Sequence, residues 1–163
     1  MIEIRTGDIL AVTEGILVHG CNCQGKMGSG IAQQIRAKWP AVYEAYKNRH
    51  EQFGLQLGDI VAVGSKKMRH LHTTSGQLPD QLIVVNAMTQ FDYGRDKGTV
   101  YVDYDAVFAA FARVSLIARD TGLTVHFPLI GCGLANGDWN EVSLAIKTAM
   151  PKDAQMVLWK LPE

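Results

Sequence analysis

The side chains best suited to chemistry gather in one short segment that contains His19, Cys21 and Cys23. Histidine titrates near neutral pH and can take a proton from water. We therefore predict that His19 orients or deprotonates a catalytic water. The alternative is a histidine of the core whose ring nitrogens are satisfied by hydrogen bonds within the protein. A zinc site from these residues, with or without Cys132, is disfavoured because alternating loop residues rarely converge and no Cys-x-x-Cys pair is present. No metal is expected.

Glycines follow these residues in a loop that we place at 20–29, between the apolar run 15–19 and a helix beginning at Gly30. Glycine lets backbone amides approach an anion closely, and the positive end of a helix dipole favours negative charge. The motif Gly28-Ser29-Gly30 therefore predicts an anion site. A tight turn without a ligand is the alternative, since so short a motif is unspecific.

A second glycine-rich loop, 128–140, also follows an apolar run and precedes a helix. Two such loops facing each other would line a cleft with amides, which suits a diphosphate. Asp138 is a candidate catalytic acid, or it caps the following helix with Glu141 as a capping-box partner. Cys132 could be activated by the helix dipole, but no base is adjacent in sequence, and packing under the loop is favoured.

The elements that must position these loops alternate along the chain. Apolar runs predict strands at 2–5, 15–19, 59–63, 82–86, 124–129 and 155–160, with a polar hairpin-like region between the third and fourth. Helical spacing predicts helices at about 30–39, 41–51, 104–120 and 139–150. In the third helix Val107, Phe111 and Leu116 are expected to face the core, and Gly122 to end it.

Strands alternating with helices predict one α/β domain over 1–163, a three-layer α/β/α sandwich with a mixed, mostly parallel sheet. In such sheets ligands bind outside the carboxyl ends of the strands. Both glycine-rich loops leave strands at that edge. The coincidence favours a ligand-binding cleft there.

Composition excludes several classes of protein. Lys plus Arg and Asp plus Glu number 16 each in 163 residues, which argues against a protein that mainly coats nucleic acid or anionic membrane. No apolar stretch approaches the roughly 20 residues of a membrane span. Three cysteines and no export signal predict reduced thiols in a cytoplasmic protein. A monomer is expected because no extra apolar stripe is evident.

Three motifs in order resemble the macro domain family, which binds ADP-ribose: Thr6-Gly7-Asp8-Ile9, Asn22 with Gly28-Ser29-Gly30, and Gly131-Cys132-Gly133-Leu134. The resemblance implies that Asp8 and Ile9 recognise adenine, that Asn22 contacts the distal ribose, and that the glycine loops hold the diphosphate. The expected ligand-binding residues are Asp8, Ile9, Cys21, Asn22, Lys26, Met27, Gly28, Ser29, Gly30, Ile31, Asn86, Gln90, Ile130, Gly131, Cys132, Gly133 and Leu134. No cofactor is implied.

The sequence motif His19-Gly20-Cys21-Asn22 is similar to the corresponding motif in one branch of the family. That branch contains ADP-ribose-1''-phosphate phosphatases and terminal ADP-ribose glycohydrolases. The glycohydrolases use a lysine after the central strand and an aspartate after Gly-Cys-Gly-Leu. Here the segment 86–90 has no lysine and the acid position is Ala135. His19 and Asp138 are the remaining catalytic candidates.

We therefore predict binding of ADP-ribose or a 1''-substituted derivative, with hydrolysis of a 1''-phosphate or of an ADP-ribosyl ester on a protein. The alternative is a module that binds free or protein-attached ADP-ribose without turnover.

Overall fold

The computed structural model describes residues 1–163 and contains one seven-stranded sheet in the order β1-β7-β6-β2-β5-β3-β4. The strands are β1 (Ile2–Thr6), β2 (Glu14–Asn22), β3 (Ile60–Ser65), β4 (Thr74–Ser75), β5 (Gln81–Gln90), β6 (Val125–Phe127) and β7 (Met156–Lys160). Every neighbouring pair is parallel except β3 with β5. The predicted mixed, mostly parallel sheet is therefore confirmed.

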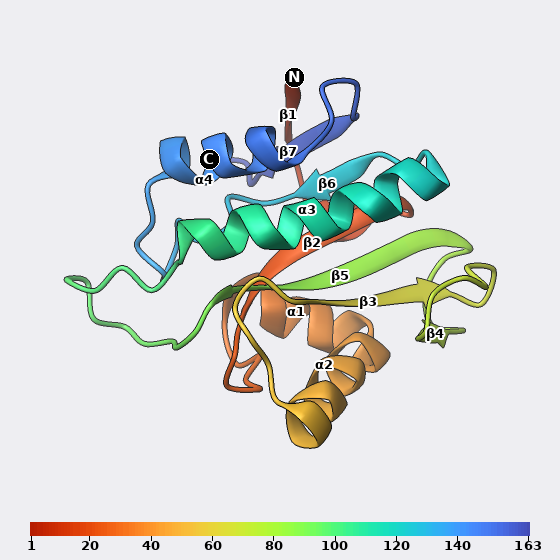
Figure 1. Cartoon of the computed structure of the whole chain (residues 1–163), viewed down its shortest axis with the longest axis horizontal. Coiled ribbons are helices and arrows are strands. Elements are labelled where there is room, and N and C mark those ends of the chain that lie inside the picture. The colour runs from red at the N-terminus through yellow and green to blue at the C-terminus, as the bar shows by residue number, and fades with distance from the viewer.

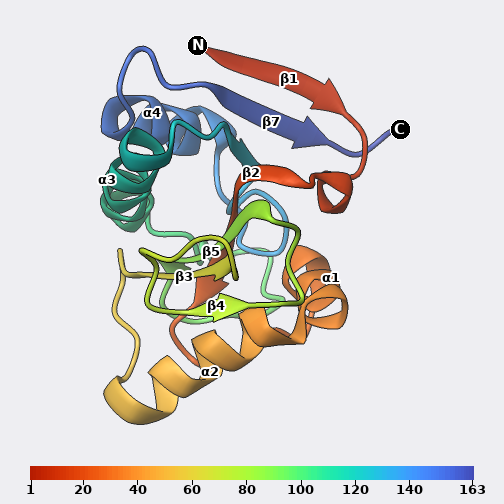
Figure 2. The same cartoon turned by 90° about the vertical axis from the view of Figure 1, so that its right-hand side faces the viewer.

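Helices cover both faces of the sheet (Figures 1 and 2). Helices α1 (Gly30–Lys38) and α2 (Pro40–Phe53) lie on one face, and α3 (Tyr104–Thr121) and α4 (Trp139–Ala149) on the other. A short 3-10 helix, η1 (Ile9–Ala11), follows β1. These three layers are the predicted α/β/α sandwich.

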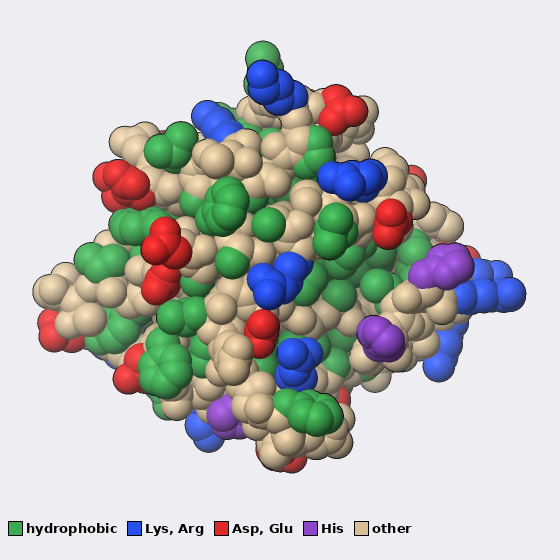
Figure 3. Space-filling view, viewed as in Figure 1, with side chains coloured by type: hydrophobic (Ala, Val, Ile, Leu, Met, Phe, Trp, Pro, Cys, Tyr) green, Lys and Arg blue, Asp and Glu red, His purple; other side chains and the backbone are tan.

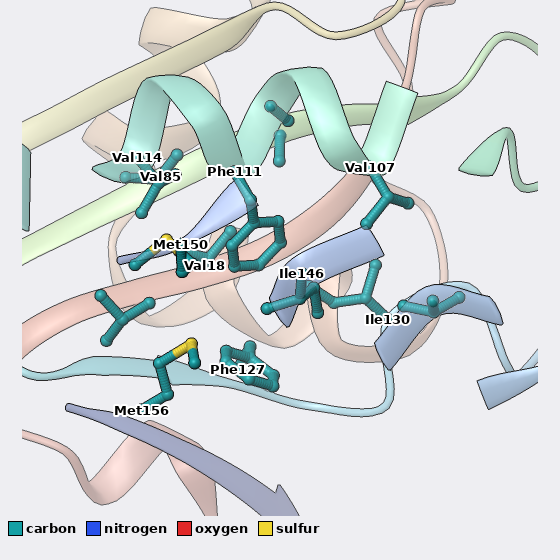
Figure 4. Close-up of a cluster of buried hydrophobic side chains, with 14 of the residues drawn as sticks. Val18, Val85, Val107, Phe111, Val114, Phe127, Ile130, Ile146, Met150 and Met156 are labelled. Atoms are coloured by element: carbon teal, nitrogen blue, oxygen red, sulfur yellow. The ribbon is translucent and has the colours of Figure 1, made fainter. Parts of the chain in front are cut away.

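Alternation along the buried central strands supplies two apolar faces. In β2, Ile16 and Val18 join the core under α3 and α4, whereas Leu17 joins the core under α1 and α2. Figure 4 shows the larger cluster, in which the rings of Phe111 and Phe127 meet edge to face with centroids 5.6 Å apart. Because the middle of β2 is buried on both faces, its residues Gly15 to Val18 are continuously apolar rather than alternating.

Helix α3 begins where Asp103 accepts a hydrogen bond from the Ala106 amide, and it ends at Gly122, which has a left-handed φ of 69°. Val107 and Phe111 are buried as predicted, but Leu116 is 54% exposed, so that part of the prediction was wrong. At about 3.6 residues per turn, Leu116 lies two and a half turns beyond Val107 and so on the opposite side of the helix.

Strands β2 and β5 are longer than predicted. Their parallel pairing continues through His19 opposite Asn86 and Cys21 opposite Met88, so the predicted loop at 20–29 begins only after Asn22. The predicted hairpin-like region joins β3 to β5, which pair antiparallel, and within it the short β4 pairs in parallel with β3 at the sheet edge. These backbone pairings depend on distant segments, which local composition does not report.

None of the helices combines the length and the apolar character that crossing a membrane requires.

Candidate functional site

A cavity of about 870 Å³ lies where β2, β5 and β6 end, bounded by residues from 20–32, 90–95 and 128–135, together with Arg36 and Tyr43. These three strands are parallel, so their carboxyl ends lie at the same end of the sheet. The two glycine-rich loops thus meet at one cavity, as the sequence predicted.

Most of the predicted binding residues line this cavity, namely Cys21, Asn22, Lys26, Met27, Gly28, Ser29, Gly30, Ile31, Gln90, Ile130, Gly131, Gly133 and Leu134. Six predicted residues do not line it: Asp8, Ile9, His19, Asn86, Cys132 and Asp138.

The N-terminus of α1 is open toward the cavity. Ser29 makes no side-chain capping hydrogen bond, and the first turn holds no acidic residue. By contrast, Asp103 and Asp138 cap α3 and α4, and each of those helices has an acidic residue in its first turn. A Cβ placed at Gly28 would meet nothing within 4 Å. The first-turn amides of α1 and their positive dipole end are therefore accessible to an anion.

Asn22 shapes the loop that leads to α1. Its Oδ1 accepts hydrogen bonds from the Gln24 amide at 2.9 Å and the Lys26 amide at 3.4 Å, and its Nδ2 donates to the Lys26 carbonyl at 2.9 Å. An amide nitrogen carries two hydrogens, so one Nδ2–H remains for a ligand. The structure thus places Asn22 in the cavity wall mainly as an organiser of the loop.

The second loop is braced by the segment before α3. Gly131 has a φ of 74°, and a Cβ there would lie 2.6 Å from Val102, so only glycine fits. The Gly137 amide donates to the Gly131 carbonyl at 2.6 Å, and the Tyr101 amide donates to the Ala135 carbonyl at 2.8 Å. The loop therefore presents Gly131 and Gly133 to the cavity from a supported backbone.

His19 is fully buried and does not reach the cavity, which corrects the predicted catalytic role. Strand alternation turns its side chain toward the face of the sheet under α2, where Nε2 lies 2.6 Å from Asn86 Oδ1. Burial lowers the pKa of His19 to about 4, and the hydrogen bond with Asn86 only partly opposes this. A neutral, enclosed imidazole cannot exchange protons with a ligand. Asn86 uses its Oδ1 in this contact with His19, and it does not line the cavity either.

Asp138 caps α4 through Oδ1, which accepts the Asn140 amide at 2.9 Å. The Asp138 amide donates to the Tyr104 hydroxyl at 3.0 Å rather than to Glu141, so the capping box does not form. The predicted alternative, an N-cap, is the role that the structure shows. Asp138 lies beyond the cavity wall, so the structure gives no support to its predicted role as the catalytic acid.

Asp8 and Ile9 lie outside the cavity wall. Asp8 Oδ1 caps η1 by accepting the Leu10 amide at 2.9 Å, and Ile9 is 4% exposed within the core under α1 and α2. Their expected role in adenine recognition stays a prediction.

Cys132 and Cys21 are not poised as nucleophiles. Burial, followed by the charge of Asp138, raises the pKa of Cys132, and its Sγ donates to the Ile130 carbonyl. Burial, followed by the proximity of Cys23, raises the pKa of Cys21. Cys21 Sγ lies 3.6 Å from His19 Nε2. Packing explains these thiols better than reactivity does.

The charge of the cavity wall is one-sided. It includes Lys26, Arg36 and Arg95 and no aspartate or glutamate, although basic and acidic side chains are intermixed over the face shown in Figure 3. The sequence as a whole carries no net charge. A wall that is cationic within a neutral molecule attracts an anionic ligand.

Comparison with known proteins identifies the family. The macro domain family model matches residues 18–146. The chain belongs to the macro domain family.

Relatives of this macro domain include proteins with assigned activities. An uncharacterized 17.5 kDa protein of Enterobacteria phage T4 is 28% identical over 93% of this chain and 92% of its own length. The DNA ADP-ribosyl glycohydrolase of Mycobacterium tuberculosis is 25% identical over 91% of this chain, which spans 38% of that relative. The ADP-ribose 1''-phosphate phosphatase of Scheffersomyces stipitis is 24% identical, covering 90% of this chain and 94% of the phosphatase.

Solved structures agree on the fold. A Bacteroides thetaiotaomicron protein of unknown function superimposes with a TM-score of 0.81 at 28% identity, covering 98% of this chain and 97% of its own. The macrodomain of Mycobacterium tuberculosis DarG superimposes with a TM-score of 0.77 at 22% identity, covering 100% and 99%.

Sequence reasoning missed several residues of the wall of this macro domain. Arg36 and Tyr43 come from α1 and α2, whereas Tyr93 and Arg95 follow β5. The helical residues look like ordinary surface positions in sequence. Tyr93 comes soon after the apolar run 82–86, a place that suits contact with the distal ribose, whereas no local pattern singles out Arg95.

Proposed function

We propose that this macro domain binds ADP-ribose-1''-phosphate with its diphosphate between the two glycine loops, and that it hydrolyses the 1''-phosphate. One observation carries the proposal: the uncapped N-terminus of α1 opens into a cavity with three cationic side chains and no carboxylate. Backbone amides at a helix start bind phosphate oxygens, and the dipole adds to their attraction.

The absent carboxylates favour phosphate removal over cleavage of a glycosidic bond. Glycoside hydrolysis is usually carried out by a pair of carboxylates that flank the bond. Phosphoryl transfer depends mainly on positioning and on stabilising charge on the phosphate oxygens. Amides and cations supply those needs here. The phosphatase among the relatives supports the same reaction, and the DNA ADP-ribosyl glycohydrolase supports a related substrate class.

A second candidate is a module that binds ADP-ribose, free or attached to a protein, without turnover. It is favoured by a specific observation: no histidine, aspartate or glutamate lines the cavity. General acid–base catalysis at neutral pH usually relies on one of these groups. Under this reading, Asn22 and the glycine loops hold the ligand and nothing activates water.

Gly28→Glu tests the site directly. The new side chain enters open space, so the fold should tolerate it, while its carboxylate lies at the α1 N-terminus and repels the diphosphate. We expect ADP-ribose affinity, measured by calorimetry, to fall at least about tenfold, or about 1.4 kcal/mol. The matched control is Gly76→Glu, which also enters open space but lies beyond β4, away from the cavity.

The reaction is tested by incubating the unaltered protein with ADP-ribose-1''-phosphate, an ADP-ribosyl ester on a protein, and ADP-ribosylated DNA, and by resolving the products by mass. Release of phosphate that Gly28→Glu abolishes supports the phosphatase. Binding without any product supports the second candidate. If no ligand binds, or if Gly76→Glu weakens binding as much as Gly28→Glu, the assignment of the cavity is wrong.

A further inference from the structure

Arg36 and Tyr43 form a stacked pair on the helical side of the cavity. The guanidinium carbon of Arg36, on α1, lies 3.8 Å from the centroid of the Tyr43 ring, on α2. Both side chains line the cavity. Stacking on an aromatic face restricts a guanidinium to one plane and leaves its edge donors free.

No protein group accepts from Arg36. The ion pairs of the structure are Arg5–Glu3, Lys47–Glu51 and Arg49–Asp59. Arg113, by comparison, donates to the carbonyls of Gly58 and Ala109. The five N–H donors of an arginine match the oxygens of a phosphate or a carboxylate. The Arg36 side chain is exposed at the cavity wall, so an external anion can reach its stacked, unpaired guanidinium.

The backbone of Arg36 lies beyond the first turn of α1. Arg36 follows Gly30 by six residues, which at about 1.5 Å per residue places its backbone roughly 9 Å further along the helix. The stack with Tyr43 keeps the guanidinium beside α2. A diphosphate held by the first-turn amides uses backbone donors, so the side-chain donors of Arg36 remain available for another anionic group.

We propose that Arg36, stacked on Tyr43, forms a second anion subsite that holds a phosphate group of the ligand beyond its diphosphate. The inference rests on the proposed function, since it presumes that the diphosphate occupies the α1 N-terminus. That further phosphate has two sources with the same chemistry. It is the 1''-phosphate of a nucleotide, or a backbone phosphate of a nucleic acid strand that carries the ADP-ribose.

The test compares Arg36→Gln with the unaltered protein on three ligands: ADP-ribose, ADP-ribose-1''-phosphate and an ADP-ribosylated single-stranded oligonucleotide. Each ligand displaces a fluorescent ADP-ribose, read within seconds of mixing to precede turnover. We expect the variant to weaken one of the two phosphate-bearing ligands at least about fivefold more than it weakens ADP-ribose. A selective loss for the nucleotide identifies the 1''-phosphate, and a selective loss for the oligonucleotide identifies the strand.

Two further variants make the outcome decisive. Tyr43→Leu removes the ring that orients the guanidinium, so it should reproduce part of the selective loss. Arg119→Gln removes an exposed arginine in the last turn of α3, away from the cavity, and should change no affinity. Equal effects of Arg36→Gln on all three ligands, or no effect on any of them, overturn the subsite. Failure of the unaltered protein to bind ADP-ribose overturns the proposed function itself, which distinguishes the two failures.

Discussion

His19 and Asn86 contact each other across the paired strands β2 and β5, with 2.6 Å between ring nitrogen and amide oxygen. Asn86 Nδ2 donates to the Val42 carbonyl, which turns its oxygen toward the ring. That oxygen can only accept, so Nε2 of a neutral His19 carries the proton. The residue type suggested catalysis, whereas its burial and its partner make it a structural group.

This contact predicts a pH dependence of stability. The folded pKa of His19 is about 4 and the ordinary value is 6.5, so the unfolded chain binds more protons between these values. Stability is therefore fully present above pH 6.5 and is lost as the pH falls toward 4, by at most about 3 kcal/mol. Urea unfolding measured from pH 7.5 to pH 4.5 checks this.

In His19→Gln the slope of unfolding free energy against pH should flatten. Part of the pH dependence of stability should persist in this variant. Burial, followed by the charge of Arg5, also lowers the pKa of His126. The control is His70→Gln, on the exposed loop between β3 and β4, which should keep the slope of the unaltered protein. An unchanged slope in His19→Gln would show that His19 does not carry the effect.

At the scale of elements, the loop between β2 and α1 is built on α2. The fully buried Tyr46 hydroxyl lies 2.6 Å from the Asn22 carbonyl and 2.9 Å from Asn22 Oδ1. One phenol thus organises the turn that carries Lys26 and Met27 into the cavity wall. No spacing along the chain relates Tyr46 to that turn.

Tyr46→Phe should therefore loosen the turn without leaving a large cavity. Loss of the hydroxyl removes the buried donor that the Asn22 carbonyl and Oδ1 share, and the expected cost is about 1–3 kcal/mol of unfolding free energy. ADP-ribose affinity should fall as well, because ordering the turn then opposes binding. Urea unfolding and calorimetry measure the two effects.

Tyr43→Phe, in the preceding turn of α2, is the matched control for stability, since the Tyr43 hydroxyl makes no hydrogen bond within the protein. It should change the unfolding free energy by less than about 0.5 kcal/mol. Equal stability losses in the two variants would contradict the role given to Tyr46.

For the whole molecule, the decisive feature is that three parallel strands end at one edge of the sheet and bring distant loops together. The cavity formed there is bounded by segments near residues 20, 90 and 130 and by helices α1 and α2, which form one of the two helical layers. Its cationic wall is a property of the assembled fold, because the chain as a whole is neutral.

Ligand binding should consequently stabilise the entire fold. ADP-ribose at one hundred times its dissociation constant should add about 2.7 kcal/mol to the unfolding free energy and raise the Tm. AMP at the same concentration should raise the Tm less, because it lacks the second phosphate and the distal ribose. Scanning calorimetry at several ligand concentrations checks this. Equal shifts for both ligands would mean that the second loop contributes nothing.

The sequence by itself determined the order of the elements, the α/β/α class and the two loops that meet at the cavity. Those features are encoded locally, in apolar runs, helical spacing and clusters of glycine. Only the tertiary structure decided which side chains reach the cavity. Strand register turned His19 inward, capping occupied Asp138, and packing of α1 on α2 brought Arg36 onto Tyr43. Each outcome depends on contacts between residues that are distant in sequence or on the direction of a side chain, and no local pattern specifies either.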